Sequence, residues 1–402
     1  MMNRRVVVTG LGIVSSIGIG IEDFWKNLIL GKSGISKVDL FDTSKFTRKN
    51  GGEVKNFNPE DFVPKQMLKF MGRASVFSIA ATKLALKDAK IPIPSIRKTE
   101  PAFVIGVTIP EGNTIDLSSH MILENDPDSL TNKFLLNIFS PSIARNTGYF
   151  FKTKGANLLI PNACSAGNYS LSYGFDLIKT GQVDLAIAGG AEALSRIAYQ
   201  GFQKLYAMAP DICAPFDKNR KGMLLGEGAG ILILEPLEKA IERKAPIYAE
   251  ILGAGLSCDA HHMTIPARRG IRKAMEKAIN DSGLKPDDID YINAHGTGTT
   301  QNDKEESTAI KEVFGERKLP VSSSKSMLGH CMGAASAIEA AACCMAIKEG
   351  VLPPTINFTE PDPECDIDCV PNTARKLKIN TALNNAFAFG GNNCCIVFGK
   401  TG

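Results

Sequence analysis

Short apolar runs along the chain alternate with longer segments in which apolar residues recur at helical spacing. Such runs predict buried strands, and the periodic segments predict amphipathic helices. In the first part, strands are expected at 6–8, 102–107, 157–160, 183–188 and 231–234, and helices at 21–31, 66–87, 116–125 and 169–179. From about Ile247 the pattern restarts, with strands at 248–253, 291–294, 319–322, 386–389 and 394–398 and helices at 270–282, 307–314 and 333–348.

This alternation predicts an α/β protein with largely parallel, buried sheets. The restart suggests a duplicated architecture of two halves, 1–246 and 247–402, although no residue-level repeat is evident. The chain has 402 residues, of which 44% are hydrophobic and 22% charged, so a sizeable core is available. Gly10 and Gly12 follow the first strand, but the third glycine of a dinucleotide-binding fingerprint is absent. These glycines are therefore interpreted as turn-formers.

The net charge and the cysteine content limit the classes of partner and the cellular compartment that the sequence allows. A net charge of +4 is too weak to indicate nucleic acid, so an acidic partner would need a local basic patch. No signal peptide and no regular disulfide spacing are evident, which favours the cytoplasm, and no apolar run reaches the roughly 20 residues that span a bilayer. The cysteine pairs 343–344 and 394–395 are expected to fill the core. Cys365 and Cys369 flank two aspartates and form only a weak metal candidate.

Cys164 lies in the segment Pro161–Asn168, where an expected strand turns into an expected helix. The first turn of a helix presents unpaired N–H groups and the positive end of the helix dipole, and both favour a thiolate. Small neighbouring residues would let a substrate carbonyl approach the sulfur. The alternative is a buried structural cysteine, which is the commoner role of a lone free cysteine.

Two of the five histidines, His295 and His330, lie in glycine-bearing loops that follow expected strands. Loops at the carboxyl ends of parallel strands are where sites are built, so these histidines and Cys164 are expected to converge. Such a trio permits a Cys/His hydrolase, a pair of donors that stabilises an oxyanion, or a zinc site. A zinc site fits poorly because the sequence spacings between these three residues are long and no fourth ligand is evident.

The turn that carries Cys164 and five further motifs together resemble the elongating β-ketoacyl-acyl-carrier-protein synthases, closest to the synthase II type, within the thiolase-like superfamily. The five further motifs occupy 188–192, 216–230, 293–303, 324–330 and 387–391. The resemblance implies a duplicated αβαβα layered fold with two mixed five-stranded sheets. It also implies a homodimer whose interface helps to build the acyl pocket, or a heterodimer with a chain-length-factor-like subunit.

In this resemblance Cys164 is the nucleophile that accepts the acyl chain, and the backbone N–H groups of Cys164 and Phe389 form the oxyanion hole. His295 and His330 bind the malonyl thioester carbonyl and stabilise the enolate formed on decarboxylation. Lys325, paired with Glu339, favours anionic intermediates nearby.

The substrate contacts are likewise implied by the resemblance. Thr297 and Thr299 would hold the pantetheine arm, and Phe389 would gate entry. Ile109, Phe202 and Phe387 would line the substrate pocket. No metal or other cofactor is expected, because the substrates carry their own phosphopantetheine.

Lys65, Lys69 and Arg73 recur at intervals of four on the expected helix 66–87 and would place a row of positive charge on one face. Such a row is most often a solvated surface. The resemblance assigns Lys65, Lys69 and Lys204 to docking of the acidic acyl carrier protein.

Several departures from the family pattern indicate a specialised synthase, for instance one that makes polyene chains, over housekeeping elongation. They are the loop 108–113 with a charged Glu111, Lys221 where an acid is usual, the closing motif 386–393, and a short segment 262–270. A non-catalytic scaffold subunit, a thiolase and a cysteine hydrolase are the competing interpretations. The cysteine, the paired histidines and the lysine together disfavour them.

Overall fold

The computed structural model describes residues 4–124, 136–137 and 141–402. Each half of the chain contributes five main strands to the central 11-stranded sheet, whose remaining strand is the short β2 (Gly18–Ile19), paired with β1. The first half supplies β1 (Val6–Ser15), β5 (Ala102–Gly106), β6 (Asn157–Ile160), β7 (Ala186–Glu192) and β8 (Gly228–Pro236). The second supplies β9 (Ala249–Cys258), β10 (Tyr291–Asn293), β11 (Val321–Ser322), β14 (Thr381–Phe387) and β15 (Asn392–Gly399). Apart from the edge strand β6 and the end of β9, these strands are almost wholly buried, which explains their apolar sequences.

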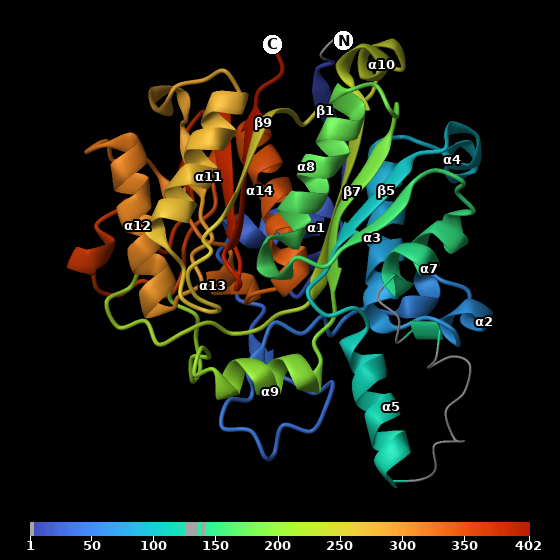
Figure 1. Cartoon of the computed structure of the whole chain (residues 1–402), viewed down its shortest axis with the longest axis horizontal. Coiled ribbons are helices and arrows are strands. Elements are labelled where there is room, and N and C mark those ends of the chain that lie inside the picture. Colours follow the sequence, from blue (N-terminus) through green and yellow to red (C-terminus); the bar gives the residue numbers. More distant parts are fainter. Residues whose placement is uncertain (1–3, 125–135, 138–140) are drawn as a thin grey trace.

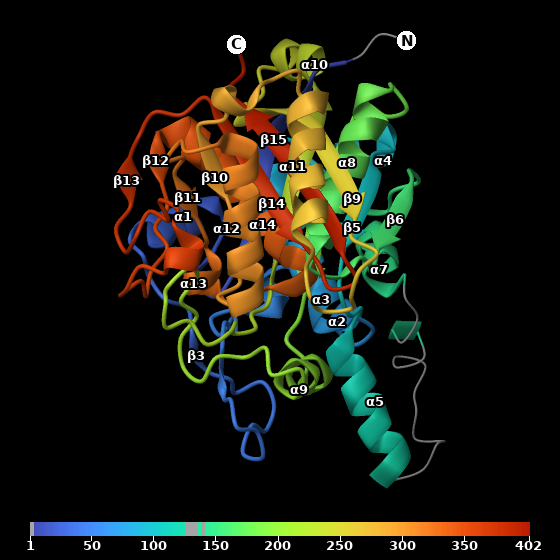
Figure 2. The same ribbon diagram turned by 60° about the vertical axis from the view of Figure 1, so that its left-hand side comes forward.

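Helices cover both faces of the strands and fill the space between the halves (Figures 1 and 2). On the outside of the first half, α3 (Arg73–Asp88) packs on β1 and β8, together with α7 (Ser142–Phe151). On the outside of the second, α11 (Arg268–Asp281) packs on β9 and β15, beside α12 (Thr300–Phe314). In the middle, α8 (Ala166–Lys179) and α14 (Ala335–Glu349) contact each other and strands of both halves. The predicted αβαβα layering is confirmed.

The two five-stranded units are joined, in contrast to the expected pair of separate sheets. The strand order is β11-β10-β14-β15-β9-β1-β8-β7-β5-β6 in the part of the chain that the structure describes. The junction is an antiparallel pairing of β1 with β9, over Val6–Val8 and Ala249–Ile251. The prediction of largely parallel sheets is also wrong, because among the strand pairings of the described residues only those of β5 and β10 with their neighbours are parallel.

The remaining helices and short strands lie around these layers. They are α1 (Ile21–Ile29), α2 (Lys65–Leu68), α4 (Ile93–Thr99), α5 (Gly112–Glu124), α9 (Arg196–Lys204), α10 (Leu237–Glu242), α13 (Lys325–Leu328), β2 (Gly18–Ile19), β3 (Ser36–Lys37), β4 (Asn50–Gly51), β12 (Val351–Leu352) and β13 (Arg375–Lys376). Both termini and α10 lie at the end of the molecule opposite α5 and α9 (Figure 1). None of the described helices has both the length and the apolar character that a bilayer crossing requires.

Most expected elements are present, with shifted ends. Asn125, the last residue of the expected helix 116–125, lies outside the described residues. The helix expected from 66 to 87 is divided at Gly72 into α2 and α3, so its row of charge is not one helical face. Lys65 and Lys69 are exposed, whereas Arg73 turns inward and pairs with the buried Glu227, with 2.6 Å between Nη2 and Oε1.

Gly10 and Gly12 lie within β1 and are not turn-formers. A Cβ atom on Gly10 would lie 2.3 Å from the Ala85 carbonyl oxygen, and one on Gly12 would lie 1.9 Å from that of Ala81. Both glycines therefore let the backbone of α3 lie directly against the strand, the close approach for which glycine inside a strand is suited.

We expect Gly12→Ala to destabilise the fold by roughly 1–3 kcal/mol, because the added methyl group meets backbone that cannot rotate away. The measurement is the free energy of unfolding from urea denaturation. Gly201→Ala in α9 is the matched control, since no atom lies within 4 Å of its added Cβ. Equal stability of the two variants would contradict the close-packing explanation.

Candidate active site

The turn that carries Cys164 connects β6 to α8 through a single turn of 3-10 helix, Ala163–Ser165. Ala163 adopts a φ of +47°, a left-handed conformation that is uncommon outside glycine and often marks functional turns. Gly167, in the first turn of α8, packs against α14, because a Cβ there would lie 2.7 Å from the Ala337 nitrogen. The small residues beside Cys164 thus serve helix packing at the site.

The Cys164 thiol is protonated at neutral pH. Burial raises the pKa of Cys164 to about 12, and the Lys325 charge and the backbone N–H groups of Phe389 and Cys164 only partly offset it. The expected thiolate at a helix start is therefore wrong for the resting protein, because burial outweighs the helix terminus. The same two backbone N–H groups do face the sulfur, which is where an oxyanion hole for an acyl thioester belongs.

His295 follows β10, and His330 follows β11 and the short helix α13. Their rings meet edge to face with centroids 5.4 Å apart. Burial and the nearby Lys325 charge hold the pKa of both histidines well below the usual range, so both are neutral. His330 is fully buried, and neither of its ring nitrogens has a hydrogen-bond partner among the described residues.

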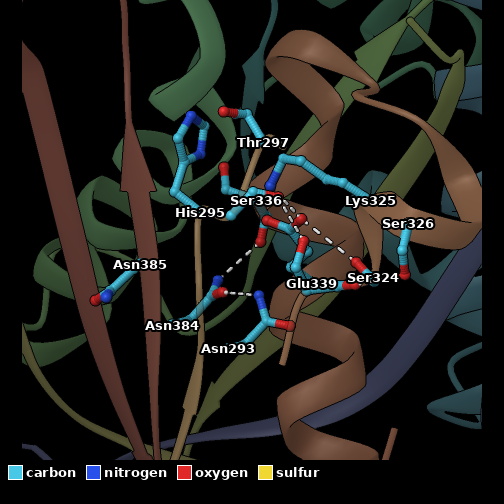
Figure 3. A network of polar contacts seen from close by, with 12 residues as sticks. Asn293, His295, Thr297, Ser324, Lys325, Ser326, Ser336, Glu339, Asn384 and Asn385 are labelled. Atoms are coloured by element: carbon cyan, nitrogen blue, oxygen red, sulfur yellow. Dashed lines mark hydrogen bonds and ion pairs between the residues drawn. The ribbon is translucent and has the colours of Figure 1, made fainter. Parts of the chain in front are cut away.

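Lys325 and Glu339 face each other near His295, with the lysine on α13 and the glutamate on α14 (Figure 3). Nζ lies 2.5 Å from Oε1, and Ser324 Oγ contacts the same oxygen at 3.4 Å. The expected pairing is therefore present. Burial raises the pKa of Glu339, and the lysine charge opposes that rise. Both side chains are almost completely buried, so removal of either partner would leave a buried charge uncompensated.

A cavity of about 320 Å³ brings most of the predicted site residues together. Among the residues that line it are Cys164, His295, His330, Thr297, Thr299, Phe202, Phe387 and Phe389. Ile109 does not line this cavity and packs in the same apolar cluster as Phe202 and Phe389. The convergence of cysteine and histidines expected from their strand-end positions is confirmed.

Family models match almost the whole chain. The N-terminal domain of β-ketoacyl synthases matches residues 3–240, and the C-terminal domain matches 248–359. The chain belongs to the β-ketoacyl synthase family. Members of this family form carbon–carbon bonds by acyl transfer, and the cavity's cysteine and paired neutral histidines accord with that chemistry.

Close relatives of this enzyme have the same length. A 3-oxoacyl-[acyl-carrier-protein] synthase 2 from Synechocystis sp. is 40% identical over 409 residues, spanning 99% of this chain and 98% of that protein. Among solved structures, the ishigamide ketosynthase/chain length factor matches with a TM-score of 0.96 and 42% identity over all of both chains. A type II polyketide synthase ketosynthase in complex with its acyl-carrier protein matches with a TM-score of 0.92 and 32% identity, again over both whole chains.

Two buried glutamates that hold the site loops were not predicted from the sequence. Glu306 on α12 accepts the backbone N–H groups of His295 and Gly296, both at 2.8 Å. Glu192, at the end of β7, accepts those of Thr108 at 2.6 Å and of Gly333 at 3.1 Å. Burial raises the pKa of each glutamate to about 7. Glu192 lies within a motif that carries the family resemblance. The sequence signal that could have identified it is an acidic residue within a run of small apolar residues.

Glu111 does not face the substrate cavity. Its carboxylate turns to the start of α3, where Oε1 accepts the backbone N–H of Ser75 at 2.9 Å and also contacts the Ser75 hydroxyl. The side chain is 1% exposed, and burial raises its pKa. The Glu111 carboxylate therefore caps the start of α3 and does not line the cavity that holds Cys164, contrary to expectation.

The weak metal candidate near Cys365 is not supported by the geometry. Asp366 pairs with Lys311, Asp368 pairs with Arg375, and both Cys365 and Cys369 are buried. Within residues 4–124, 136–137 and 141–402, no three His, Cys, Asp or Glu side chains are grouped as metal ligands. The cysteine pairs 343–344 and 394–395 fill the core as predicted.

Proposed function

We propose that this enzyme is a β-ketoacyl-acyl-carrier-protein synthase that condenses an acyl chain held on Cys164 with malonyl-carrier protein, giving a 3-oxoacyl-carrier protein. The observation that carries the proposal is one cavity lined by a buried thiol and two neutral imidazoles. A thiol alone would suit hydrolysis, whereas two neutral N–H donors beside it suit an enolate that attacks the acylated sulfur.

In the first half-reaction the Cys164 sulfur attacks the acyl thioester carbonyl. Since the thiol is protonated in the resting enzyme, its proton leaves as the new C–S bond forms and ends on the departing carrier thiol. The negative charge on the carbonyl oxygen is stabilised by the backbone N–H groups of Cys164 and Phe389, which already face the sulfur.

In the second half-reaction malonyl-carrier protein enters the cavity, and its thioester oxygen accepts N–H groups from His295 and His330. The bond to the carboxylate breaks, CO₂ leaves and the electron pair forms an enolate. The enolate carbon then attacks the acyl carbonyl, and Cys164 departs as a thiolate, which takes up a proton from water to restore the resting thiol. The Lys325 charge, placed near His295 by Glu339, favours these anionic states.

Phe389 acts as the gate between the two substrates. Its ring stacks on Phe202 with centroids 5.7 Å apart, and both rings line the cavity while packing in the apolar cluster that contains Ile109. An acyl chain on Cys164 would reach that cluster only when Phe389 rotates. In the lining of the same cavity, the hydroxyls of Thr297 and Thr299 lie 2.9 Å apart and would bind the pantetheine arm. Phe387, against His295, completes the malonyl side.

The acyl carrier protein is the proposed partner for substrate delivery. Lys65 and Lys69 on α2, and Lys204 at the end of α9, are exposed and available to an acidic surface. Lys204 lies two residues from Tyr206, which lines the cavity, so docking there would place the carrier next to the entrance. Of two matched structures, one is a ketosynthase/chain length factor and the other is an acyl-carrier protein in complex with its ketosynthase.

A second subunit would cover the outer edge of the first half. There β6 is an edge strand with Leu158 partly exposed, and the neighbouring α7 and α5 expose Tyr149 at 72% and Leu123 at 83%. Exposed apolar residues beside an unpaired strand are typical of an interface. A homodimer is the default, and the alternative is the active half of a heterodimer with a chain-length-factor-like subunit.

We assign the two halves of the chain to residues 1–246 and 247–402. We place the enzyme in the cytoplasm, and we propose that it acts without a metal or a separate cofactor.

Specialised condensation is favoured over housekeeping fatty-acid elongation by Lys221, the closing motif 386–393 and the short segment 262–270. Condensation is tested by incubating the protein with malonyl-carrier protein and acyl-carrier-protein primers of graded length, with mass spectrometry of the products. We expect 3-oxoacyl products from a restricted set of primers. Broad elongation of ordinary saturated primers would contradict the specialised role, and the absence of any condensation would contradict the synthase assignment.

A further inference from the structure

The entrance of the active-site cavity carries one unpaired cation, Lys221. It is the only lysine or arginine among the lining residues, and no aspartate or glutamate lines the cavity, in the part of the chain that the structure describes. Cys164 and His330 lie at the buried end, whereas Lys221 is exposed to solvent. An anion that reaches into this cavity therefore meets one fixed positive charge, and meets it at the entrance.

Neighbouring cations differ from Lys221 in having carboxylate partners. Lys218 pairs with Glu360, Arg220 with Asp362, and Lys304 with Glu364. No ion pair or hydrogen bond occupies the Lys221 ammonium group among the described residues. Its charge is consequently free for a ligand, while the charges around it stabilise the fold.

The residues on both sides of Lys221 bind the loop that carries Thr297 and Thr299 or the first residue of the helix that follows it. The buried Arg220 donates from Nη2 to the Thr300 carbonyl at 3.2 Å. Gly222 N–H donates to the Gly298 carbonyl at 2.9 Å, with a φ of +123°. A side chain at Gly222 would also meet the Ala207 carbonyl at 2.5 Å. Lys221 is thus held in place beside the proposed pantetheine loop.

We propose that Lys221 binds the phosphate of the phosphopantetheine arm and so selects phosphorylated thioester substrates. This inference rests on the proposed function, which places the thioester at Cys164 and the pantetheine along Thr297 and Thr299. The phosphate lies at the opposite end of the arm from the thioester, and an ammonium group at the cavity entrance is a suitable partner for it. The malonyl carboxylate is a second anion in the reaction, but it enters with the thioester end, far inside the entrance.

The test compares Lys221→Met, which removes the charge and retains length, with Lys221→Arg, which retains the charge. Lys98→Met is the matched control, because Lys98 is exposed on α4, outside the cavity, and its replacement changes net charge equally. Substrates are acyl and malonyl thioesters of phosphopantetheine, of pantetheine without phosphate, and of the carrier protein. Initial rates give KM and kcat separately at low and at physiological salt.

We expect Lys221→Met to raise KM for the phosphopantetheine thioesters about 3–10-fold, with kcat nearly unchanged and the difference shrinking at high salt. KM for pantetheine thioesters should not change, and Lys221→Arg should resemble the wild type. A change only for malonyl-pantetheine would assign Lys221 to the carboxylate and overturn the proposal. A change only for carrier-protein substrates would assign it to protein docking, and no change would also refute it. Wild-type turnover of carrier-protein substrates separates these outcomes from failure of the proposed function.

Discussion

The Cys164→Gln variant is expected to form no 3-oxoacyl product while it releases CO₂ from malonyl-carrier protein at least as fast as the wild type. Condensation falls by more than about 10³-fold because no sulfur remains to hold the acyl chain. Decarboxylation persists because His295 and His330 are untouched, and because the glutamine amide imitates an acylated cysteine beside the N–H groups of Cys164 and Phe389. The measurement is parallel detection of labelled CO₂ and of 3-oxoacyl product by mass spectrometry.

Cys258→Gln provides the matched control, since Cys258 is an exposed free cysteine that does not line the cavity. It should retain both reactions. Normal condensation by Cys164→Gln would refute the nucleophile assignment. Loss of both reactions, in a protein with an unchanged circular dichroism spectrum, would show that the thiol is also needed for decarboxylation.

Much of the site could be predicted from the sequence because its residues directly follow strands along the chain. The loop after β6 carries Cys164, and the loops after β10 and β11 carry His295 and His330. Strand ends of a layered α/β fold converge, so position along the chain predicts proximity in space. The Lys325–Glu339 pair could be predicted for a different reason. The family pattern places an acidic residue at a fixed distance after His330, on the helix that follows it.

Properties that depend on burial could not be predicted from motif position. The helix start beside Cys164 suggested a thiolate, yet the surrounding packing raises the pKa of the thiol to about 12. Glu111 was interpreted as a charge in the acyl pocket, but its side chain turns toward α3 because the Ser75 N–H is there to be satisfied. The continuous sheet depends on a pairing between β1 and β9, strands more than 200 residues apart, which periodicity within either half does not reveal.

We expect His330→Ala to lower the rate of malonyl decarboxylation about 10²–10³-fold, as loss of one oxyanion donor does in other enzymes. Acylation of Cys164 should change far less, because its oxyanion is stabilised by backbone N–H groups. The His330 ring has no partner among the described residues, so its donor is free for substrate. The backbone is held independently of the ring, since His330 N–H donates to the Leu224 carbonyl and the Gly226 N–H donates to the His330 carbonyl. The folded structure should therefore survive the substitution.

Three measurements test the expected effect of His330→Ala: CO₂ release from malonyl-carrier protein, the rate of Cys164 labelling by an acyl thioester, and thermal stability. His261→Ala is the control, because His261 is exposed and does not line the cavity. His330→Asn should recover part of the decarboxylation, since an amide restores one N–H donor near the lost one. Loss of Cys164 labelling with decarboxylation intact would reverse the roles assigned here, because the ring would then serve acyl transfer. Recovery by asparagine but not by a leucine of similar size would show that the donated hydrogen bond, and not the volume of the ring, stabilises the enolate.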